Sequence, residues 1–422
     1  MAGIYIHIPF CRRKCHYCNF FSLASQKHKG AFLEALKKEI LLTRDYLAGD
    51  PVNTIYFGGG TPSVYSPGEL QEVVEMFASP SDEVVPKVSF YRRDAKAQRN
   101  KALIVNPLRL CVSADNLKKL PFDTTSRDLI PSNPEITLEV NPEDVTKGFV
   151  SELKGTWFNR FSLGVQSFSD EDLGSLNRSH SARQALLAVQ LLQEAEYENI
   201  SIDLIYGIPG ASSARWKKNL EIAFSLGVPH ISAYALTVEP KTPLAWMIDR
   251  HKSEPVNEEI QIDQFRILME KTKEKGYLQY EISNFCKPGR HAVHNTNYWN
   301  GIPYLGLGPS AHSFNGTSRR WNISNLSKYI DLMDKGECIY EEEILTTVQK
   351  YNEYVMTSLR TMWGCESRKI ISDFGFQISD FFRENALPMI GKGMLTEISG
   401  IYYLTDEGKL FADRVASELF LV

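Results

Sequence analysis

The sequence lacks three features that would each assign it to a broad class of protein. None of its apolar runs approaches the length that crosses a bilayer, which argues against a transmembrane helix. No charge sign dominates, because 47 Lys and Arg face 51 Asp and Glu, so nucleic acid is not expected as the main partner. No basic segment precedes a long apolar one near the first residue. We therefore expect no secretory signal and a cytoplasmic location.

Cysteine is scarce and unevenly placed. Three of the seven cysteines, Cys11, Cys15 and Cys18, lie within one short loop. The other four are scattered singly, at Cys111, Cys286, Cys338 and Cys365. An odd number of cysteines in a long chain does not resemble a disulfide framework. The pattern instead predicts a reducing compartment and one thiolate metal site.

Short β-branched or aromatic runs alternate with amphipathic helical patterns along the first part of the chain. We predict strands at Ile4–Ile8, Thr54–Phe57, Ile136–Val140, Phe161–Val165, Ile200–Ile205 and His230–Leu236. Helices are predicted near 31–47, 67–78, 143–153, 181–194 and 213–226. Such βα units predict an α/β fold with a parallel sheet. We favour an incomplete (β/α)6 barrel, and periodicity alone leaves a doubly wound open sheet as the alternative.

The alternation of predicted strands and helices divides the chain into three regions. Residues 1–240 would form the partial barrel, with a long insertion at 81–132 that interrupts it. Residues 241–340 would flank the barrel. Residues 341–422 are predicted to form a mainly helical, winged-helix-like domain with a small hairpin. Its mixed charge gives no reason to expect DNA binding.

Unusual polar residues follow the predicted strands at the point where each strand ends. They include the cysteine loop, Gly58–Pro62, Glu139, Gln166 and Asp203. In (β/α) barrels the carboxyl ends of the strands form the active face. We therefore expect one pocket to collect residues that lie far apart in the sequence.

The cysteine loop has the spacing C-x3-C-x2-C at Cys11, Cys15 and Cys18. Cysteine thiolates hold iron–sulfur clusters, and three of them leave one iron of a [4Fe–4S] cube without a protein ligand. S-adenosylmethionine (SAM) can bind that iron through its amino and carboxylate groups, and it then supplies radical chemistry. The alternative is a zinc site completed by His16 or His7. Zinc sites usually combine two separated pairs of Cys or His ligands, such as two C-x2-C motifs. The sequence has no second pair with that spacing.

Together, the cysteine loop and Gly58–Pro62 resemble the radical SAM superfamily. Further motifs are similar to the oxygen-independent coproporphyrinogen dehydrogenase group. They are Tyr5–Cys11, Leu163–Phe168, Asn177-Arg178 and Ile202–Gly207. The run His294–Trp299 resembles the HNxxYW signature of the HemW family of heme chaperones. The resemblance extends over nearly the whole chain and implies a radical SAM partial barrel.

The resemblance implies a set of SAM contacts around the cluster held by the three cysteines. They are Tyr5, Tyr17, Gly59, Gly60, Thr61, Glu139, Gln166, Arg178 and Asp203. The chemistry of these residues agrees with that role. Carboxylates accept hydrogen bonds from ribose hydroxyls or an amino group, and arginine pairs with a carboxylate.

The resemblance also implies heme as a cofactor. His294 is the candidate ligand, and Tyr298 and Trp299 are candidates to pack on the ring. Weaker ligand candidates are His312, His291 and Cys286. The alternative is that the two aromatic residues pack a core and that His294 makes a structural hydrogen bond.

Two functions from different classes follow. The first is a heme chaperone that passes heme to an acceptor protein and has an electron donor for its cluster. The second is an oxygen-independent coproporphyrinogen III oxidase. The true dehydrogenases carry a fourth cysteine where this chain has Phe20, and they carry an extension ahead of the strand that begins here at Ile4. We therefore favour the chaperone and leave enzymatic activity open. A monomer or a dimer, and a peripheral position at a membrane during delivery, are both compatible with this function.

Overall fold

The structure is a computed structural model that describes residues 1–78, 89–94 and 133–422. The insertion predicted at 81–132, with Cys111, lies outside the described residues, apart from the backbone of β3 (Ser89–Asp94). Among the helices of the described residues, none combines the length and apolarity needed to span a bilayer.

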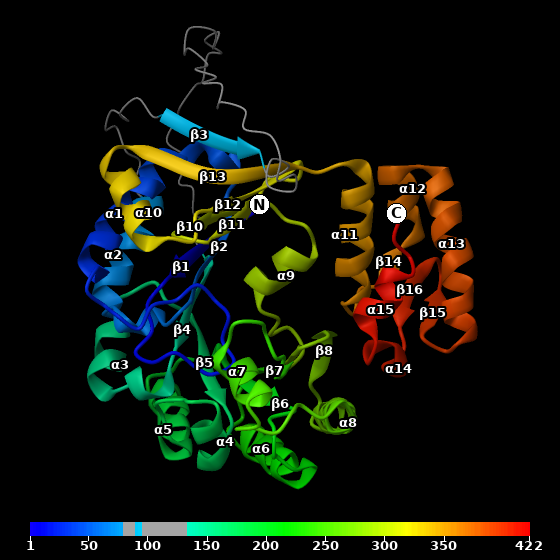
Figure 1. The fold of residues 1–422 in the computed structure, drawn as a ribbon, viewed down its shortest axis with the longest axis horizontal. Helices are drawn as coiled ribbons and strands as arrows, with labels where there is room; N and C mark the ends of the chain where they lie inside the picture. The colour runs from blue at the N-terminus through cyan, green and yellow to red at the C-terminus, as the bar shows by residue number, and fades with distance from the viewer. Residues whose placement is uncertain (79–88, 95–132) are drawn as a thin grey trace, which may run out of the picture.

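All six predicted strands form and lie side by side in the order in which they occur along the chain (Figure 1). They are β1 (Ala2–Ile8), β2 (Val52–Gly59), β4 (Glu135–Val140), β5 (Arg160–Gln166), β6 (Ile200–Tyr206) and β7 (His230–Ala235). Each strand pairs in parallel with the next. The β-branched runs become strands because both faces of the sheet are covered: Ile4, Ile6 and Ile8 are buried on one face, and His7 is buried on the other.

The connecting helices lie in one layer outside these strands (Figure 1). They are α1 (Lys29–Thr43), η1 (Arg44–Leu47), α2 (Pro67–Ala78), α3 (Lys147–Leu153), α5 (Ala182–Glu194), α6 (Ser213–Ser225), α8 (Glu258–Glu274) and α10 (Leu326–Asp334). Neighbouring helices contact one another in the order α10, α1, α2, α3, α5, which follows the strand order. A single helical layer is typical of a curved partial barrel, whereas a doubly wound sheet carries helices on both faces. The predicted incomplete barrel is confirmed.

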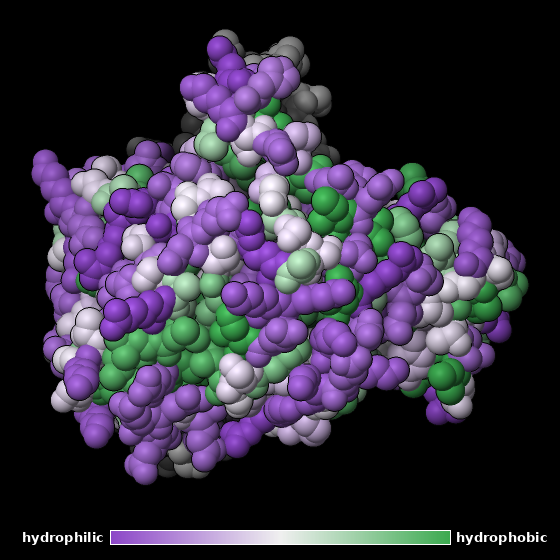
Figure 2. Space-filling view, turned by 90° about the horizontal axis from the view of Figure 1, so that it is seen from below, coloured by the Kyte–Doolittle hydropathy of each residue, from purple (hydrophilic) through white to green (hydrophobic). Residues whose placement is uncertain are grey.

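The helices are amphipathic, and their apolar sides face the sheet. Helix α5 shows the local cause, because Ser181 and Gln184 form a capping box at its start and Ala185, Ala188 and Leu192 are buried. Seen from below, the outer surface is mostly hydrophilic, with apolar side chains gathered in patches (Figure 2).

The sheet extends beyond the six predicted strands on both sides. On the β1 side, β10 (Tyr304–Leu307) adds a further parallel strand. Antiparallel pairing then joins β11 (His312–Phe314), β12 (Ser318–Asn322) and β13 (Glu337–Ile344). On the other side, β9 (Asn284–Cys286) and β8 (Leu278–Glu281) follow β7. The sheet does not close on itself in the described part of the chain, and its end strands are β3 and β8.

The last part of the chain has its own hydrophobic core, around Tyr351, Val355 and Phe382. Its elements are α11 (Thr347–Leu359), β14 (Cys365–Glu366), α12 (Ser367–Phe374), α13 (Phe376–Gly391), β15 (Leu395–Ile398), β16 (Ile401–Leu404), α14 (Asp406–Lys409) and α15 (Ala412–Ser417). Helices with a small three-stranded sheet match the winged-helix-like arrangement that we predict. This region lies beside the barrel (Figure 1), and the Met362 N–H donates to the Tyr280 carbonyl oxygen at 2.9 Å.

Candidate functional site

A cavity of about 590 Å³ runs inside the curved sheet. Its walls come from every second residue of the strands, because alternate side chains point to opposite faces. Strand β5 contributes Arg160, Ser162, Gly164 and Gln166. Since these residues run from the first to the last position of the strand, the cavity extends along the whole strand.

The two ends of the cavity are named here the rim and the floor. The rim lies at the carboxyl ends of the strands and is lined by Cys11, Cys15, Tyr17, Cys18, Gly59, Gly60, Thr61, Gln166 and Arg178. The floor lies at the amino ends, where the short helix α9 (Val293–Trp299) packs against β1 and β2. The floor is lined by Arg160, His230, Ala292, His294, Asn295 and Tyr298. Between the two ends lie Tyr5, Tyr56, Glu139, Ser162, Asp203 and Ser232.

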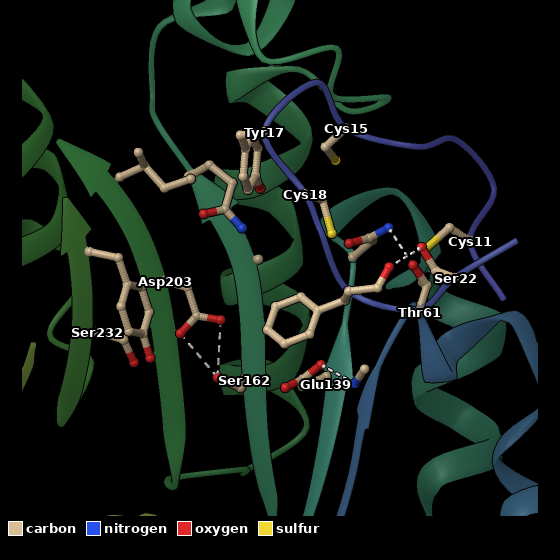
Figure 3. A pocket seen from close by; sticks show the side chains of 18 of the residues that line it. Cys11, Cys15, Tyr17, Cys18, Ser22, Thr61, Glu139, Ser162, Asp203 and Ser232 are labelled. Carbon is tan, nitrogen blue, oxygen red and sulfur yellow. Dashed lines mark hydrogen bonds between the residues drawn. The ribbon is translucent and has the colours of Figure 1, made fainter. Parts of the chain in front are cut away.

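The cysteine loop follows β1 and forms one side of the rim (Figure 3). Its base is fixed by backbone pairing, since Cys11 N–H donates to the Leu23 oxygen at 3.0 Å and Leu23 N–H donates to the Pro9 oxygen at 2.8 Å. Burial raises the pKa of the Cys11 and Cys18 thiols. In the described residues, no three His, Cys, Asp or Glu side chains are arranged to hold a single metal ion.

The glycine loop after β2 packs directly on the base of the cysteine loop. Gly60 N–H donates to the Ile8 oxygen at 2.8 Å, and Thr61 N–H donates to the Phe10 oxygen at 2.7 Å. Gly59 has φ +100°, and a Cβ there would collide with the His7 ring. A Cβ on Gly60 would lie 2.5 Å from the Phe10 oxygen. These glycines are therefore required by packing between the two loops as well as by access to the cavity.

Arg178 brings positive charge to the rim. Its Nη1 lies 3.4 Å from Cys15 Sγ, and its Nη2 donates to Asn141 Oδ1 and to the Gly164 oxygen, each at 2.8 Å. Its Nε is buried without a hydrogen-bond partner among the described residues. Burial alone would lower its pKa, but Tyr17 and Cys15 raise the pKa above its usual value. The guanidinium therefore stays charged beside the thiols.

Two carboxylates line the middle of the cavity (Figure 3). Burial raises the pKa of Glu139 to about 7, although the Tyr56 hydroxyl at 2.7 Å and the Gly59 N–H at 3.2 Å donate to it. Burial also raises the pKa of Asp203, which accepts from Ser162 Oγ at 3.1 Å. Both groups are therefore easier to protonate than an exposed carboxylate.

The structure brings all nine residues predicted for SAM to this one cavity. Tyr5 stacks on Tyr56 with ring centroids 6.2 Å apart, and its hydroxyl lies 3.0 Å from His7 Nδ1. Tyr17 packs against an apolar cluster that includes Leu176. Gln166 ends β5 at a register shift and has φ +66°.

The structure separates the three residues predicted for heme. His294 is buried at the floor, with Nδ1 2.8 Å from Thr54 Oγ1 and Nε2 2.9 Å from the Tyr298 hydroxyl. Burial, with Arg160 as a second cause, lowers the pKa of His294 to about 3. Tyr298 lines the cavity, whereas Trp299 does not and lies under the Arg360 guanidinium at 5.5 Å.

The weaker ligand candidates lie outside the residues that line the cavity. His312 is exposed and stacks on Trp321. His291 packs edge-on against Tyr280. Cys286 is fully buried in β9, and burial raises its pKa to about 11.

Several cavity residues are absent from the predicted set. They are Tyr56, Asn141, Arg160, Ser162, His230, Ser232 and Asn295. A sequence signal for some of them exists, because Ser162 and Ser232 recur at alternate positions with Arg160 and His230 inside otherwise apolar strands. Our predictions used the strand ends and the family resemblance, and they missed this pattern.

Comparisons with known proteins agree with this geometry. The sequence profile of the "Radical SAM superfamily" matches residues 5–223. The chain is 30% identical over 419 residues to "Heme chaperone HemW" of Bacillus subtilis (strain 168), with 98% of each chain covered. It is 27% identical over 423 residues to "Heme chaperone HemW" of Mycobacterium tuberculosis (strain ATCC 25618 / H37Rv), covering 99% of this chain and 94% of that protein.

A solved structure shares the fold. Coproporphyrinogen III oxidase (HemN) from Escherichia coli, a radical SAM enzyme, superposes with a TM-score of 0.76 at 19% identity. The match covers 99% of this chain and 90% of that chain. At this identity the likeness concerns the fold.

Proposed function

Because the chain belongs to the radical SAM superfamily and, within it, to the HemW family, we propose that it is a heme chaperone. It would hold a [4Fe–4S] cluster and SAM at the rim, bind heme and pass the heme to an acceptor protein. An electron donor would serve the cluster. One observation carries the proposal: three thiols and nine predicted cofactor residues line one cavity, in a chain that HemW heme chaperones match over nearly its full length.

Cys11, Cys15 and Cys18 are the cluster ligands in this proposal. Three thiolates suit a four-iron cluster that keeps one open iron, and such a cluster supplies an electron to SAM when both are bound. Arg178, 3.4 Å from Cys15 Sγ, offsets part of the negative charge of the thiolates. The rim therefore offers both the soft ligands and the counter-charge that such a cluster needs.

The residues next to the cluster loop fit SAM by their donor chemistry. Arg178 can pair with the carboxylate of SAM, and its buried Nε has no partner among the described residues. Glu139 and Asp203 can accept from ribose hydroxyls or from the amino group. The backbone of Gly59–Thr61 borders the same space.

Heme binding is proposed from the HemW relatives, with His294, Tyr298 and Trp299 as candidates. For His294 to ligate iron, one ring nitrogen would have to leave Thr54 or Tyr298. Trp299 would act outside the cavity, near Arg360. Heme ligation by His294 therefore requires a rearrangement at the floor.

Heme transfer is tested with hemin-loaded protein and apomyoglobin as the acceptor probe. We expect the hemin absorbance spectrum to change to that of myoglobin, at a rate that depends on the cluster and on SAM. A protein that binds no hemin under anaerobic conditions would refute the proposal.

Coproporphyrinogen III oxidase activity is the alternative outcome. Phe20 stands at the position of the fourth cysteine of those enzymes, and it is 61% exposed beside the rim. Reconstituted protein incubated with coproporphyrinogen III, SAM and a reductant should form no protoporphyrinogen. Formation of that product would replace the chaperone proposal by the enzymatic one.

A further inference from the structure

Arg160 places a buried positive charge at the floor of the cavity. It is the first residue of β5, its side chain is 3% exposed, and it lines the cavity. Its Nε is buried without a hydrogen-bond partner, and no hydrogen bond to the rest of its guanidinium occurs among the described residues. The guanidinium thus has only a loose ion pair, with Glu135, although removing a charge from water is unfavourable unless the charge is well paired and hydrogen-bonded.

The nearest carboxylate is already engaged elsewhere. Glu135 Oε2 lies 3.9 Å from Arg160 Nε, which is beyond hydrogen-bond distance. Glu135 Oε2 accepts from the Val293 N–H at 3.0 Å, and its Oε1 accepts from the His294 N–H at 2.9 Å. Within the described chain, no other carboxylate lies within ion-pair distance of Arg160.

The other ionisable groups of the floor do not compete for an anion. Burial lowers the pKa of His230 and His294, so both imidazoles are neutral. His230 is also held by Ser201 Oγ at 2.7 Å and by the Tyr280 hydroxyl at 2.9 Å. Arg160 is therefore the one positive charge among the residues that line the floor.

We propose that Arg160 anchors a carboxylate group of a ligand that fills the lower part of the cavity. A guanidinium offers paired donors that match the two oxygens of a carboxylate. Such an ion pair would satisfy the donors that the protein itself leaves without partners.

This carboxylate belongs to a ligand other than SAM. Arg160 and Gln166 are the ends of β5, and a strand of this length spans on the order of 20 Å. The SAM carboxylate is assigned to the rim, near Arg178 and the cluster thiols. The ligand's identity rests on the proposed function: for a heme chaperone the carboxylate is a heme propionate.

A small-anion test examines the subsite without assuming heme. Thermal unfolding of the full chain is measured in sodium propionate, in propionamide, and in sodium chloride at matched ionic strength. Propionate should raise the Tm above the values in both controls, because only the charged probe pairs with Arg160. The response should disappear in Arg160→Gln and persist in part in Arg160→Lys, which keeps the charge.

Arg320→Gln is the matched control for loss of a buried arginine. Arg320 lies in the same sheet, on β12, and its buried Nε also has no hydrogen-bond partner among the described residues. Its guanidinium stacks over Tyr46 at 3.8 Å, and it is not among the residues that line the cavity. It should respond to propionate as the wild type does. If Arg320→Gln also abolishes the rise in Tm with propionate, the loss of that rise in Arg160→Gln reflects general destabilisation, and the subsite is refuted.

A second arm identifies the source of the carboxylate, by titration with hemin and with hemin dimethyl ester. Hemin should bind about tenfold more tightly than the ester, and Arg160→Gln should remove that difference. A propionate response without hemin binding would keep the subsite and refute the heme function. If hemin binds but neither the propionate response nor the preference over the ester depends on Arg160, the subsite is refuted and the proposed function stands. Absence of all three effects refutes the subsite as well.

Discussion

The rim and the floor of the cavity are lined by the same strands but use their polar groups differently. At the rim, the cysteine and glycine loops are fixed by their backbones, and their thiols have a guanidinium nearby. At the floor, His230 and His294 each use both ring nitrogens in hydrogen bonds of 2.7–2.9 Å. The thiols of the rim therefore remain free to bind a ligand, whereas both histidines of the floor are engaged within the protein, and His294 also links α9 to β2 through Thr54.

The two family motifs of the chain lie at opposite ends of the cavity. His294–Trp299 lies at the amino ends of the strands, with His294 between Thr54 and Tyr298. The cluster motif lies at the opposite end, where (β/α) barrels place their chemistry. The two motifs therefore differ in their surroundings: the cysteine thiols line the cavity at the rim, whereas both ring nitrogens of His294 are engaged in hydrogen bonds at the floor.

Removal of one thiol of the rim should have the largest effect. Cys15→Ala should abolish the cluster, because two thiolates do not replace three, and bound iron and sulfide should fall to background after anaerobic reconstitution. Cys338→Ala removes a buried thiol outside the cavity and should retain the cluster. Normal iron and sulfide in the Cys15 variant would show that the rim is not the cluster site.

Substitution of His294 at the floor should lower the stability of the protein and leave its cluster content unchanged. His294→Ala leaves Thr54 and Tyr298 without their buried partner and opens a cavity, so it should lower the free energy of unfolding by about 3–4 kcal/mol. Urea denaturation measures this, with the exposed His312→Ala as a control that should change by less than about 0.5 kcal/mol. Unchanged stability, or a lost cluster in a folded His294 variant, contradicts the assignment.

Packing between the glycine loop and the cysteine loop should make a glycine at position 59 necessary for stability. Gly59→Ala places a Cβ against the His7 ring at a positive φ, and it should lower the free energy of unfolding by about 2–3 kcal/mol. Gly68→Ala, in α2, meets nothing within 4 Å and should be neutral or slightly stabilising. Equal effects of the two substitutions would mean that the loops do not pack as described.

Between rim and floor, Glu139 should make stability depend on pH. Burial raises its pKa to about 7 in the folded protein, above the ordinary value of 4.5. Between these values the folded state binds more protons, so the free energy of unfolding should fall by about 2 kcal/mol as the pH rises from 5 to 8. The Glu139→Gln variant should lack this component of the decrease in denaturation series. Parallel pH profiles of the two proteins would contradict a buried, easily protonated carboxylate.

The sequence was informative where local pattern determines position. The six strands could be predicted from β-branched runs, and the shared carboxyl edge of parallel strands places Gln166 at the rim. Glu139 and Asp203, which we also expected at strand ends, instead lie within their strands and line the middle of the cavity. The place of His294 could not be predicted, since α9 reaches the floor only through long-range packing on β1 and β2. Arg160 escaped notice for a related reason: at the start of a strand an arginine is usually exposed, and only the closed floor buries it.

Electron paramagnetic resonance of the reduced, anaerobically reconstituted protein, recorded with and without SAM, tests the central claim most directly. We predict a [4Fe–4S] signal that SAM alters in the wild type and in His294→Ala, and that is missing in Cys15→Ala. Protein that retains zinc in place of iron and sulfide, or a cluster signal that SAM leaves unaltered, would contradict an open iron at the rim.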